Sequence, residues 1–213
     1  MRAAAAPTSS TAWSHADRVA TVRAAGHSRT GTRWIVDPLD GTTNYVHGFP
    51  AYCVSIALAE GNEILVAAIY DPLRDECFTA RRGGGAFLNG IAIAPPRVTV
   101  ADEAVAAVSF PARVTVDSPA VADFLAVLPH VQAIRRTGST ALNLAYVACG
   151  RLHAFWVRRI CCWDAAAGIL IAREAGCVLG GFAGRSDAIA LDDPSFIVAS
   201  TPELLAAIRG MLG

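Results

Sequence analysis

Apolar and polar positions alternate along the stretch that follows Arg33, and this spacing predicts a series of β-strands. Turn-forming pairs such as Gly61-Asn62 and Asp71-Pro72 separate the apolar segments. We therefore expect an antiparallel meander. Its strands should cover Trp34–Val36, Tyr52–Ala59, Ile64–Tyr70, Glu76–Ala80 and Ala86–Leu88.

The second half of the chain alternates between strand-like and helix-like segments, which is typical of layered α/β proteins. Strands are expected at Val105–Phe110, Ala133–Arg136, Leu152–Val157, Cys177–Leu179 and Phe196–Ala199. Helices are expected at Pro119–Leu128, Thr140–Ala148, Asp164–Ala175 (with Gly176 as its stop signal) and Pro202–Met211. The predicted fold class is α/β, an α+β layered sandwich in which a meander precedes an alternating α/β half.

The first 32 residues differ from the rest of the chain. They are rich in Ala, Ser, Thr and Arg and lack a sustained apolar period, although residues 16–25 could form a short helix. We expect residues 1–32 to be an atypical, poorly ordered segment and residues 33–213 to form the folded domain.

The composition excludes several classes of function. The 213 residues carry 18 basic and 18 acidic side chains without a Lys/Arg block, so binding to nucleic acid through a basic face is not expected. Apolar residues make up 54% of the chain, yet no run approaches the roughly 20 apolar residues that span a membrane. The six cysteines form no C-x-x-C pair, so we interpret them as core residues of a cytoplasmic protein rather than zinc ligands.

The candidate chemistry begins where the first predicted strand ends. Asp37 and Asp40 follow Trp34–Val36, and Gly41-Thr42-Thr43 come next. Two carboxylates with the Leu39 carbonyl offer the oxygen ligands that Mg²⁺ prefers, and the glycine and threonines offer N–H and hydroxyl groups for a phosphate. The alternative interpretation is an acidic turn with a capping role.

Two further segments carry a functional and a structural interpretation. Asp164 stands at the start of an Ala-rich predicted helix, where it could be an N-cap or a third carboxylate for a cation. Gly138-Ser139-Thr140 opens another predicted helix, where it could line a polar pocket or only cap the helix. Arg81-Arg82-Gly83-Gly84-Gly85 resembles a phosphate-binding loop, but it lacks the P-loop lysine and leads into no helix, so we interpret it as a hairpin connection.

These residues occur in segments that resemble the inositol monophosphatase family of Mg²⁺-dependent phosphatases. The segment Asp37-Pro38-Leu39-Asp40-Gly41-Thr42-Thr43-Asn44 resembles the first family signature. Trp163-Asp164-Ala165-Ala166-Ala167-Gly168, continued by Glu174-Ala175-Gly176, resembles the second. Residues 78–90 also look like family sequence, and the resemblance covers residues 33 to about 210.

The resemblance implies a role for each matching residue. Asp37, the Leu39 carbonyl, Asp40 and Asp164 would be metal ligands. Thr42 would help to orient the attacking water, and Asp40 is also expected to be a catalytic residue. The remaining expected contacts bind substrate: the amides of Gly41, Thr42 and Thr43 would hold the phosphate, and Gly138, Ser139 and Thr140 would face the alcohol part.

The chain also departs from the family pattern. Relatives carry a helical region with a Gly-Glu-Glu motif about twenty residues ahead of the first signature, whereas none of the residues before Asp37 is a glutamate. Asp17 stands at the corresponding distance in a dissimilar context. We expect that the amino-terminal region was lost, or that the start codon or reading frame was misassigned; helices missing there would leave apolar sheet surface exposed. Val157 stands where many relatives have a substrate-binding glutamate, which weakens selectivity for inositol.

The sequence as a whole predicts a Mg²⁺-dependent phosphomonoesterase for a small sugar or polyol phosphate such as inositol monophosphate. Histidinol phosphate, fructose bisphosphate or a nucleotide bisphosphate are alternative substrates, because related enzymes handle them. The alternative function is a catalytically impaired family member that binds metal or phosphate. The expected partner is a small phosphorylated metabolite, and the family resemblance implies a homodimer.

Overall fold

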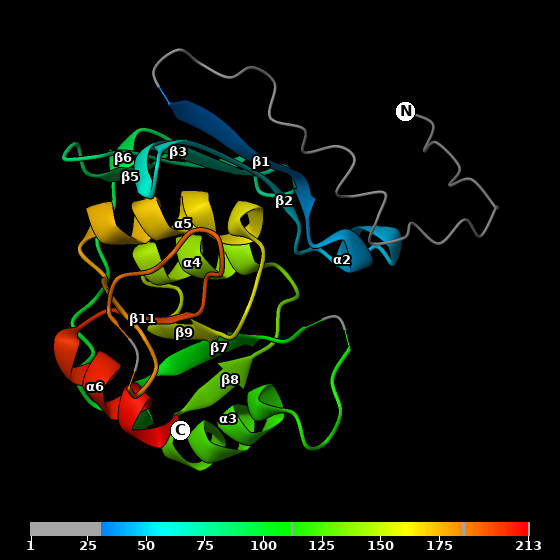
Figure 1. Cartoon of the computed structure of the whole chain (residues 1–213), viewed down its shortest axis with the longest axis vertical. Helices are drawn as coiled ribbons and strands as arrows, with labels where there is room; N and C mark the ends of the chain where they lie inside the picture. Colours follow the sequence, from blue (N-terminus) through cyan, green and yellow to red (C-terminus); the bar gives the residue numbers. More distant parts are fainter. Residues whose placement is uncertain (1–30, 112, 185, 213) are drawn as a thin grey trace.

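A computed structural model describes residues 31–111, 113–184 and 186–212, which form four layers (Figure 1). An antiparallel sheet forms the first layer, and the helices α4 (Thr140–Ala148) and α5 (Cys162–Ala175) form the second. A mixed sheet follows, and α3 (Pro119–Val127) and α6 (Pro202–Met211) cover its far side. The predicted layered α/β sandwich is therefore confirmed.

The first sheet is the predicted meander, because its six strands lie side by side in chain order and pair antiparallel. Small side chains occupy the inner face of the second strand, at Cys53, Ser55, Ala57 and Ala59, and α5 packs close to this face. The strands are β1 (Thr32–Asp40), β2 (Cys53–Glu60), β3 (Glu63–Asp71), β4 (Glu76–Arg81), β5 (Ala86–Leu88) and β6 (Ile91–Ala92).

The second sheet has five strands in the order β10-β11-β9-β7-β8. Its central strand β9 pairs parallel with β7 and antiparallel with β11, and β7 also pairs parallel with β8. These strands are β7 (Val105–Ser109), β8 (Ala133–Arg135), β9 (Ala154–Val157), β10 (Val178–Gly180) and β11 (Phe196–Ala199).

Each side of the second sheet contributes to a separate core. Phe155 and Val157 of β9 face the helices α4 and α5, whereas Trp156 faces α3 and α6. Since successive side chains of a strand point to opposite faces, this central strand is buried on both sides. The short elements are α2 (Thr42–Val46) and two 3₁₀ turns at Ala101–Glu103 and Leu128–His130.

The structure corrects the sequence prediction at the first strand and at one helix start. Strand β1 does not end at Val36 but continues through Asp40, so the two aspartates lie within a strand rather than in a turn. Helix α5 begins at Cys162 instead of Asp164. The elements α2 and β6 were not predicted because five-residue and two-residue segments show no apolar period. Gly176 ends α5 with a φ of 96°, as expected.

The amino-terminal expectations concern mainly residues outside the described part. The short helix at residues 16–25 and Asp17 both lie among residues 1–30. Thr32, which the prediction assigned to the atypical segment, is the first residue of β1.

The outer face of the first sheet carries exposed apolar side chains, as the sequence predicted. Trp34, Leu58 and Val66 form one cross-strand row, in which Trp34 is 56% and Val66 40% exposed. Among the described residues, no helix combines the length and apolar character needed to cross a membrane.

Candidate metal centre

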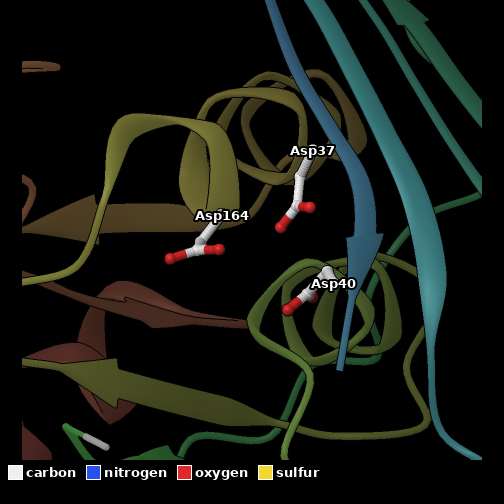
Figure 2. A group of neighbouring side chains, drawn as sticks. All are labelled: Asp37, Asp40 and Asp164. Carbon is white, nitrogen blue, oxygen red and sulfur yellow. The ribbon is translucent and has the colours of Figure 1, made fainter. Parts of the chain in front are cut away.

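Three aspartates from distant parts of the chain converge between the first sheet and the helix layer. Asp37 and Asp40 come from β1, and Asp164 comes from the first turn of α5. Figure 2 shows the three carboxylates pointing toward one another, and one oxygen from each lies within 4.8 Å of the other two. A divalent cation binds carboxylate oxygens at this kind of spacing.

A β-bulge places Asp37 and Asp40 on the same face of β1. Asp37 pairs with Ser55 and Asp40 with Cys53, so three steps along β1 match two steps along β2. Residues three apart in a regular strand would point to opposite faces, and one extra residue brings both side chains to the inner face. Accordingly Asp37 is only 9% exposed and Asp40 only 7% exposed.

The carboxylate of Asp40 is held by donors from two neighbouring elements. Its Oδ2 accepts hydrogen bonds from the Ser139 hydroxyl at 2.6 Å and the Ala141 amide at 2.8 Å, both at the start of α4. The Cys53 thiol donates to the same oxygen at 3.9 Å. Burial and the charge of Asp40 raise the pKa of Cys53, so this thiol keeps its proton. These contacts fix the orientation of Asp40.

Further hydrogen bonds hold the carboxylate of Asp37 and the backbone beside Asp164. The Leu39 amide donates to Asp37 Oδ1 at 3.0 Å within the bulge. The Ser55 hydroxyl donates to the Trp163 carbonyl at 3.2 Å, which ties the residue before Asp164 to β2. The N-cap interpretation of Asp164 is wrong: Cys161 is the N-cap of α5, and Asp164 lies inside the first turn.

Burial and neighbouring negative charge shift the protonation of Asp40 and Asp164. Burial, followed by the charge of Asp37, raises the pKa of Asp40 to about 6 despite the hydrogen bond from Ser139. Burial and the charges of Asp40 and Asp37 raise the pKa of Asp164 well above the ordinary aspartate value. Such shifts mark a site whose negative charge lacks compensation, and a bound cation would supply it. The residues present therefore fit an oxygen-liganded divalent metal.

The residues that follow the bulge form a compact turn into α2. The Thr42 hydroxyl donates to the Leu39 carbonyl at 3.0 Å. Gly41 has a φ of 86°, and a Cβ there would lie 2.6 Å from the Ala51 carbonyl oxygen, so only glycine fits. The first amides of α2, including those of Thr42 and Thr43, have no partner within the helix.

Asn44 links this turn to the segment that precedes α4. Its side-chain amide donates to the carbonyls of Ala51 at 2.6 Å and Thr137 at 2.8 Å. Gly138 follows with a φ of 84°, and a Cβ there would collide with Asn44. Asn44 thus links the turn after β1 directly to the start of α4, although the two segments were interpreted separately from the sequence.

The residues Gly138, Ser139 and Thr140 have different roles in the structure. Ser139 is the N-cap of α4, because its side chain accepts from the Leu142 amide, and it is completely buried beside Asp40. Thr140 shares a 2.9 Å hydrogen bond with Ser109 of β7. The helix-capping interpretation is confirmed for Ser139, and contact between this segment and a substrate remains a prediction.

Several supporting residues escaped sequence reasoning. Cys53 and Ser55 looked like ordinary strand residues, although both lie on the inner face of β2 and contact the aspartate cluster or its neighbour. Their only sequence signal was a polar atom at positions where the alternation predicts core. The Arg81–Gly85 segment connects β4 to β5, which confirms the hairpin interpretation.

The fold and the site define a layered α/β protein with a three-carboxylate centre beside the turn into α2. The profile of the Inositol monophosphatase family matches residues 15–211. The chain therefore belongs to the inositol monophosphatase family.

Individual relatives agree with this assignment. The chain is 47% identical over 161 residues to "Nus factor SuhB" of Xylella fastidiosa, a match that covers 75% of this chain and 58% of that protein. It is 45% identical over 145 residues to "Inositol-1-monophosphatase" of Rhizobium meliloti, covering 68% and 54%. A solved inositol monophosphatase from Anabaena superposes with a TM-score of 0.81 at 34% identity, covering 88% of this chain and 73% of that one. The chain thus spans little more than half the length of these two curated relatives.

Proposed function

We propose that this protein is a Mg²⁺-dependent phosphomonoesterase that hydrolyses a small sugar or polyol phosphate such as inositol monophosphate. The observation that carries the proposal is the convergence of Asp37, Asp40 and Asp164 within 4.8 Å beside the start of α2. Family membership and the relative named inositol-1-monophosphatase support the same class of reaction. The six cysteines carry thiols, which suits a cytoplasmic location where thiols stay reduced.

The three aspartates and the Leu39 carbonyl would hold the metal. Bound there, Mg²⁺ supplies charge neutralisation for the phosphate and lowers the pKa of a water molecule. The protein's own contribution is positional: the bulge in β1 and the donors to Asp40 hold the carboxylates in place before any cation arrives.

Thr42 is suited to orient the attacking water. Its proton is engaged by the Leu39 carbonyl, so the hydroxyl oxygen can accept a hydrogen bond from that water. The amides at the start of α2 would bind phosphate oxygens at the same time. Positioning of this kind accounts for much of the catalysis in displacement at phosphorus, and no covalent enzyme intermediate is needed.

The alcohol part of the substrate would lie near Gly138, Ser139 and Thr140. Val157 does not help to select it, because this side chain is completely buried in β9 and has no hydrogen-bond acceptor. We therefore expect weak selectivity among polyol phosphates. Histidinol phosphate, fructose bisphosphate and nucleotide bisphosphates belong in any test of specificity.

The alternative is a catalytically impaired protein that binds metal or phosphate without appreciable turnover. None of the 36 residues before Asp37 is a glutamate, whereas relatives carry a Gly-Glu-Glu motif ahead of the first signature. This departure from the family pattern motivates the alternative. The name of the relative "Nus factor SuhB" refers to a different role. The aspartate cluster gives no information about such a role in this chain.

Phosphate release from the substrate panel, measured with Mg²⁺ titrated, tests the proposal. Asp37→Asn and Asp164→Asn are the test variants, and Asp192→Asn is a matched control because that side chain is 90% exposed. We expect turnover that requires Mg²⁺, falls at least 100-fold in both test variants and is unchanged in the control. Absence of turnover from folded protein that still binds Mg²⁺ would contradict the proposal and favour the impaired alternative.

A further inference from the structure

A cationic pocket lies beside α4, apart from the aspartate cluster. It has a volume of about 370 Å³ and is lined by Arg74, Arg135, Thr137, Tyr146, Arg151 and Leu152. Three guanidinium groups come from three different segments: the β3–β4 turn, strand β8 and the loop after α4. Like charges repel when they converge, so this arrangement requires either internal carboxylates or an external anion.

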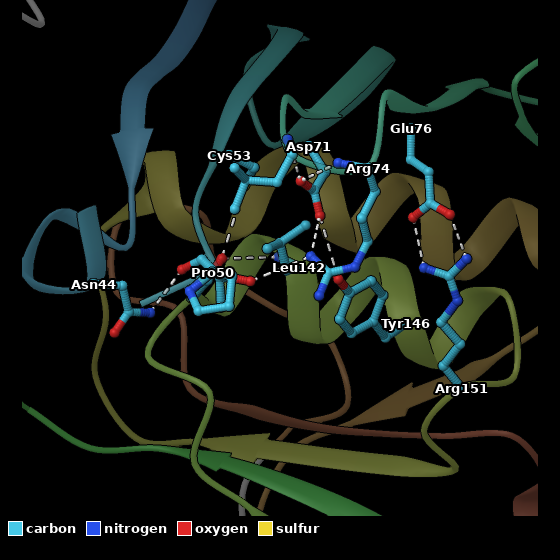
Figure 3. Close-up of polar contacts among 12 residues, drawn as sticks. Asn44, Pro50, Cys53, Asp71, Arg74, Glu76, Leu142, Tyr146 and Arg151 are labelled. Carbon is cyan, nitrogen blue, oxygen red and sulfur yellow. Dashed lines mark hydrogen bonds and ion pairs between the residues drawn. The ribbon is translucent and has the colours of Figure 1, made fainter. Parts of the chain in front are cut away.

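Internal carboxylates hold two of the three arginines. Arg74 donates to Oδ2 of the completely buried Asp71 at 2.8 Å and to the Pro50 carbonyl at 3.3 Å. Arg151 forms a two-pronged ion pair with Glu76, at 2.6 Å for each contact (Figure 3).

An aromatic ring adds to this arrangement. The guanidinium of Arg151 lies 5.1 Å from the ring centre of Tyr146, whose hydroxyl donates to Asp71 at 3.4 Å. Arginine forks held in this way lose little conformational freedom when they bind a ligand.

Arg135 is the uncompensated member of the set. Among the described residues its guanidinium makes one hydrogen bond, at 3.3 Å to the neighbouring Ile134 carbonyl, and no ion pair. Three positive charges against Asp71 and Glu76 leave one net positive charge at the pocket. A guanidinium fork matches the geometry of phosphate oxygens.

We propose that the cationic pocket binds a phosphate group, with Arg135 as its main contact and Arg74 and Arg151 as fixed flanking donors. The phosphate comes either from a free anion or from a second phosphoryl group of a substrate. Thr137 connects this pocket to the aspartate cluster, since its carbonyl accepts from Asn44 and its hydroxyl donates to Asn143 at 2.8 Å. A bound phosphate would stabilise the segment that leads to Ser139.

Titration of inorganic phosphate into metal-free protein in EDTA tests this site by calorimetry. Without metal, the aspartate cluster is negative and repels phosphate, so it does not contribute binding. Arg135→Gln is the test variant on an exposed position of an edge strand. Arg82→Gln is the matched control, because it removes one exposed positive charge outside the pocket. Circular dichroism verifies that both variants fold.

We expect wild type and Arg82→Gln to bind phosphate equally and Arg135→Gln to bind at least tenfold more weakly. No binding to wild type, or equal binding to Arg135→Gln, would overturn the proposal. Neither result depends on turnover, so it is independent of the proposed phosphatase activity.

A second arm of the experiment identifies the source of the phosphate. A non-hydrolysable analogue of a sugar bisphosphate and the matching monophosphate analogue are titrated with Mg²⁺ present, so that the aspartate cluster can bind one of the phosphate groups. Tighter binding of the bisphosphate that disappears in Arg135→Gln assigns the pocket to a second substrate phosphate. Equal binding of the two sugars, with loss of inorganic phosphate binding in Arg135→Gln, assigns it to a free anion. Both results support the pocket.

Discussion

For single residues, the site depends on how three neighbouring carboxylates are kept close together without a compensating charge. Ser139, Cys53 and the Ala141 amide all donate to one oxygen of Asp40. These hydrogen bonds favour the ionised form, but burial has the larger effect and the pKa of Asp40 rises to about 6. The metal-free protein should therefore carry unfavourable charge at neutral pH.

This charge predicts a pH-dependent stability of the metal-free protein. The pKa of Asp40 rises from 3.8 to about 6 on folding, so the folded state binds more protons than the unfolded state between about pH 4 and pH 6. The free energy of unfolding should consequently fall as the pH rises through this window, by on the order of 2–3 kcal/mol. Urea unfolding in EDTA at several pH values measures the decrease.

Replacement of one carboxylate should reduce that decrease. Asp164→Asn removes a group whose own pKa is raised by burial and by the charges of Asp40 and Asp37, so the unfolding free energy of this variant should change less between pH 4 and pH 7.5. Asp192→Asn, on an exposed side chain, should behave like wild type. Identical pH profiles for wild type and Asp164→Asn would contradict the prediction.

Ser139 should affect both stability and metal affinity. Ser139→Ala removes an N-cap and the 2.6 Å hydrogen bond to Asp40, so we expect a loss of about 1–2 kcal/mol and Mg²⁺ binding weakened about 10-fold or more. Thr201→Ala removes the N-cap of α6, which lies outside the site, and should reduce stability alone. Calorimetric Mg²⁺ titration separates the two effects; equal Mg²⁺ affinity in both variants would count against a positioning role for Ser139.

At the scale of elements, the hairpin between β4 and β5 is anchored by the far end of α5. The Glu174 carboxylate accepts hydrogen bonds from the Gly83 amide at 2.8 Å and the Gly85 amide at 2.9 Å. The glycine-rich segment that resembles a phosphate-binding loop thus already binds an anion, and that anion is a side chain of the same protein.

Glu174→Ala should leave two amides of the hairpin without their carboxylate partner and destabilise the fold by about 1–3 kcal/mol. Glu174→Gln keeps an acceptor and should have an intermediate effect. Hydrogen exchange should become faster at Gly83 and Gly85 in the alanine variant. Glu203→Ala, on an exposed residue of α6, is the control, and an equally small effect of both alanine substitutions would argue against the anchor.

The sequence predicted most elements because strand alternation and turn residues are local signals. It misplaced the end of β1, since Pro38 and two aspartates resemble a turn whereas the backbone forms a bulge paired with β2. It misplaced the start of α5 because Cys161, the N-cap, makes no side-chain capping bond. The candidate metal ligands Asp37, the Leu39 carbonyl, Asp40 and Asp164 were predicted from two short signatures, but contacts such as Ser139 to Asp40 join residues 99 positions apart and leave no local trace.

At the scale of the whole molecule, the outer face of the first sheet leaves an apolar row of Trp34, Leu58 and Val66 in contact with solvent. Contiguous apolar surface promotes association. We therefore expect the protein to be marginally soluble or to associate, as a homodimer or with a partner.

Trp34→Lys should reduce self-association in light scattering while changing the unfolding free energy by only about 0.5 kcal/mol, because the residue is exposed. Ile91→Lys makes the same kind of change at a position that is 74% exposed and outside the row, and it should not reduce association. A monodisperse wild-type monomer with a high melting temperature would contradict the expectation.

We infer that the bulge in β1 and the first turn of α5 bring three carboxylates together as one divalent-metal centre. Calorimetric titration of Mg²⁺ into wild type and Asp164→Asn, with Asp192→Asn as the control, tests it most directly. We expect saturable binding to wild type and to the control, and at least 10-fold weaker binding to Asp164→Asn. Equal Mg²⁺ affinity in all three proteins, or no Mg²⁺ binding to folded wild type, would show that the aspartate cluster is not a metal centre.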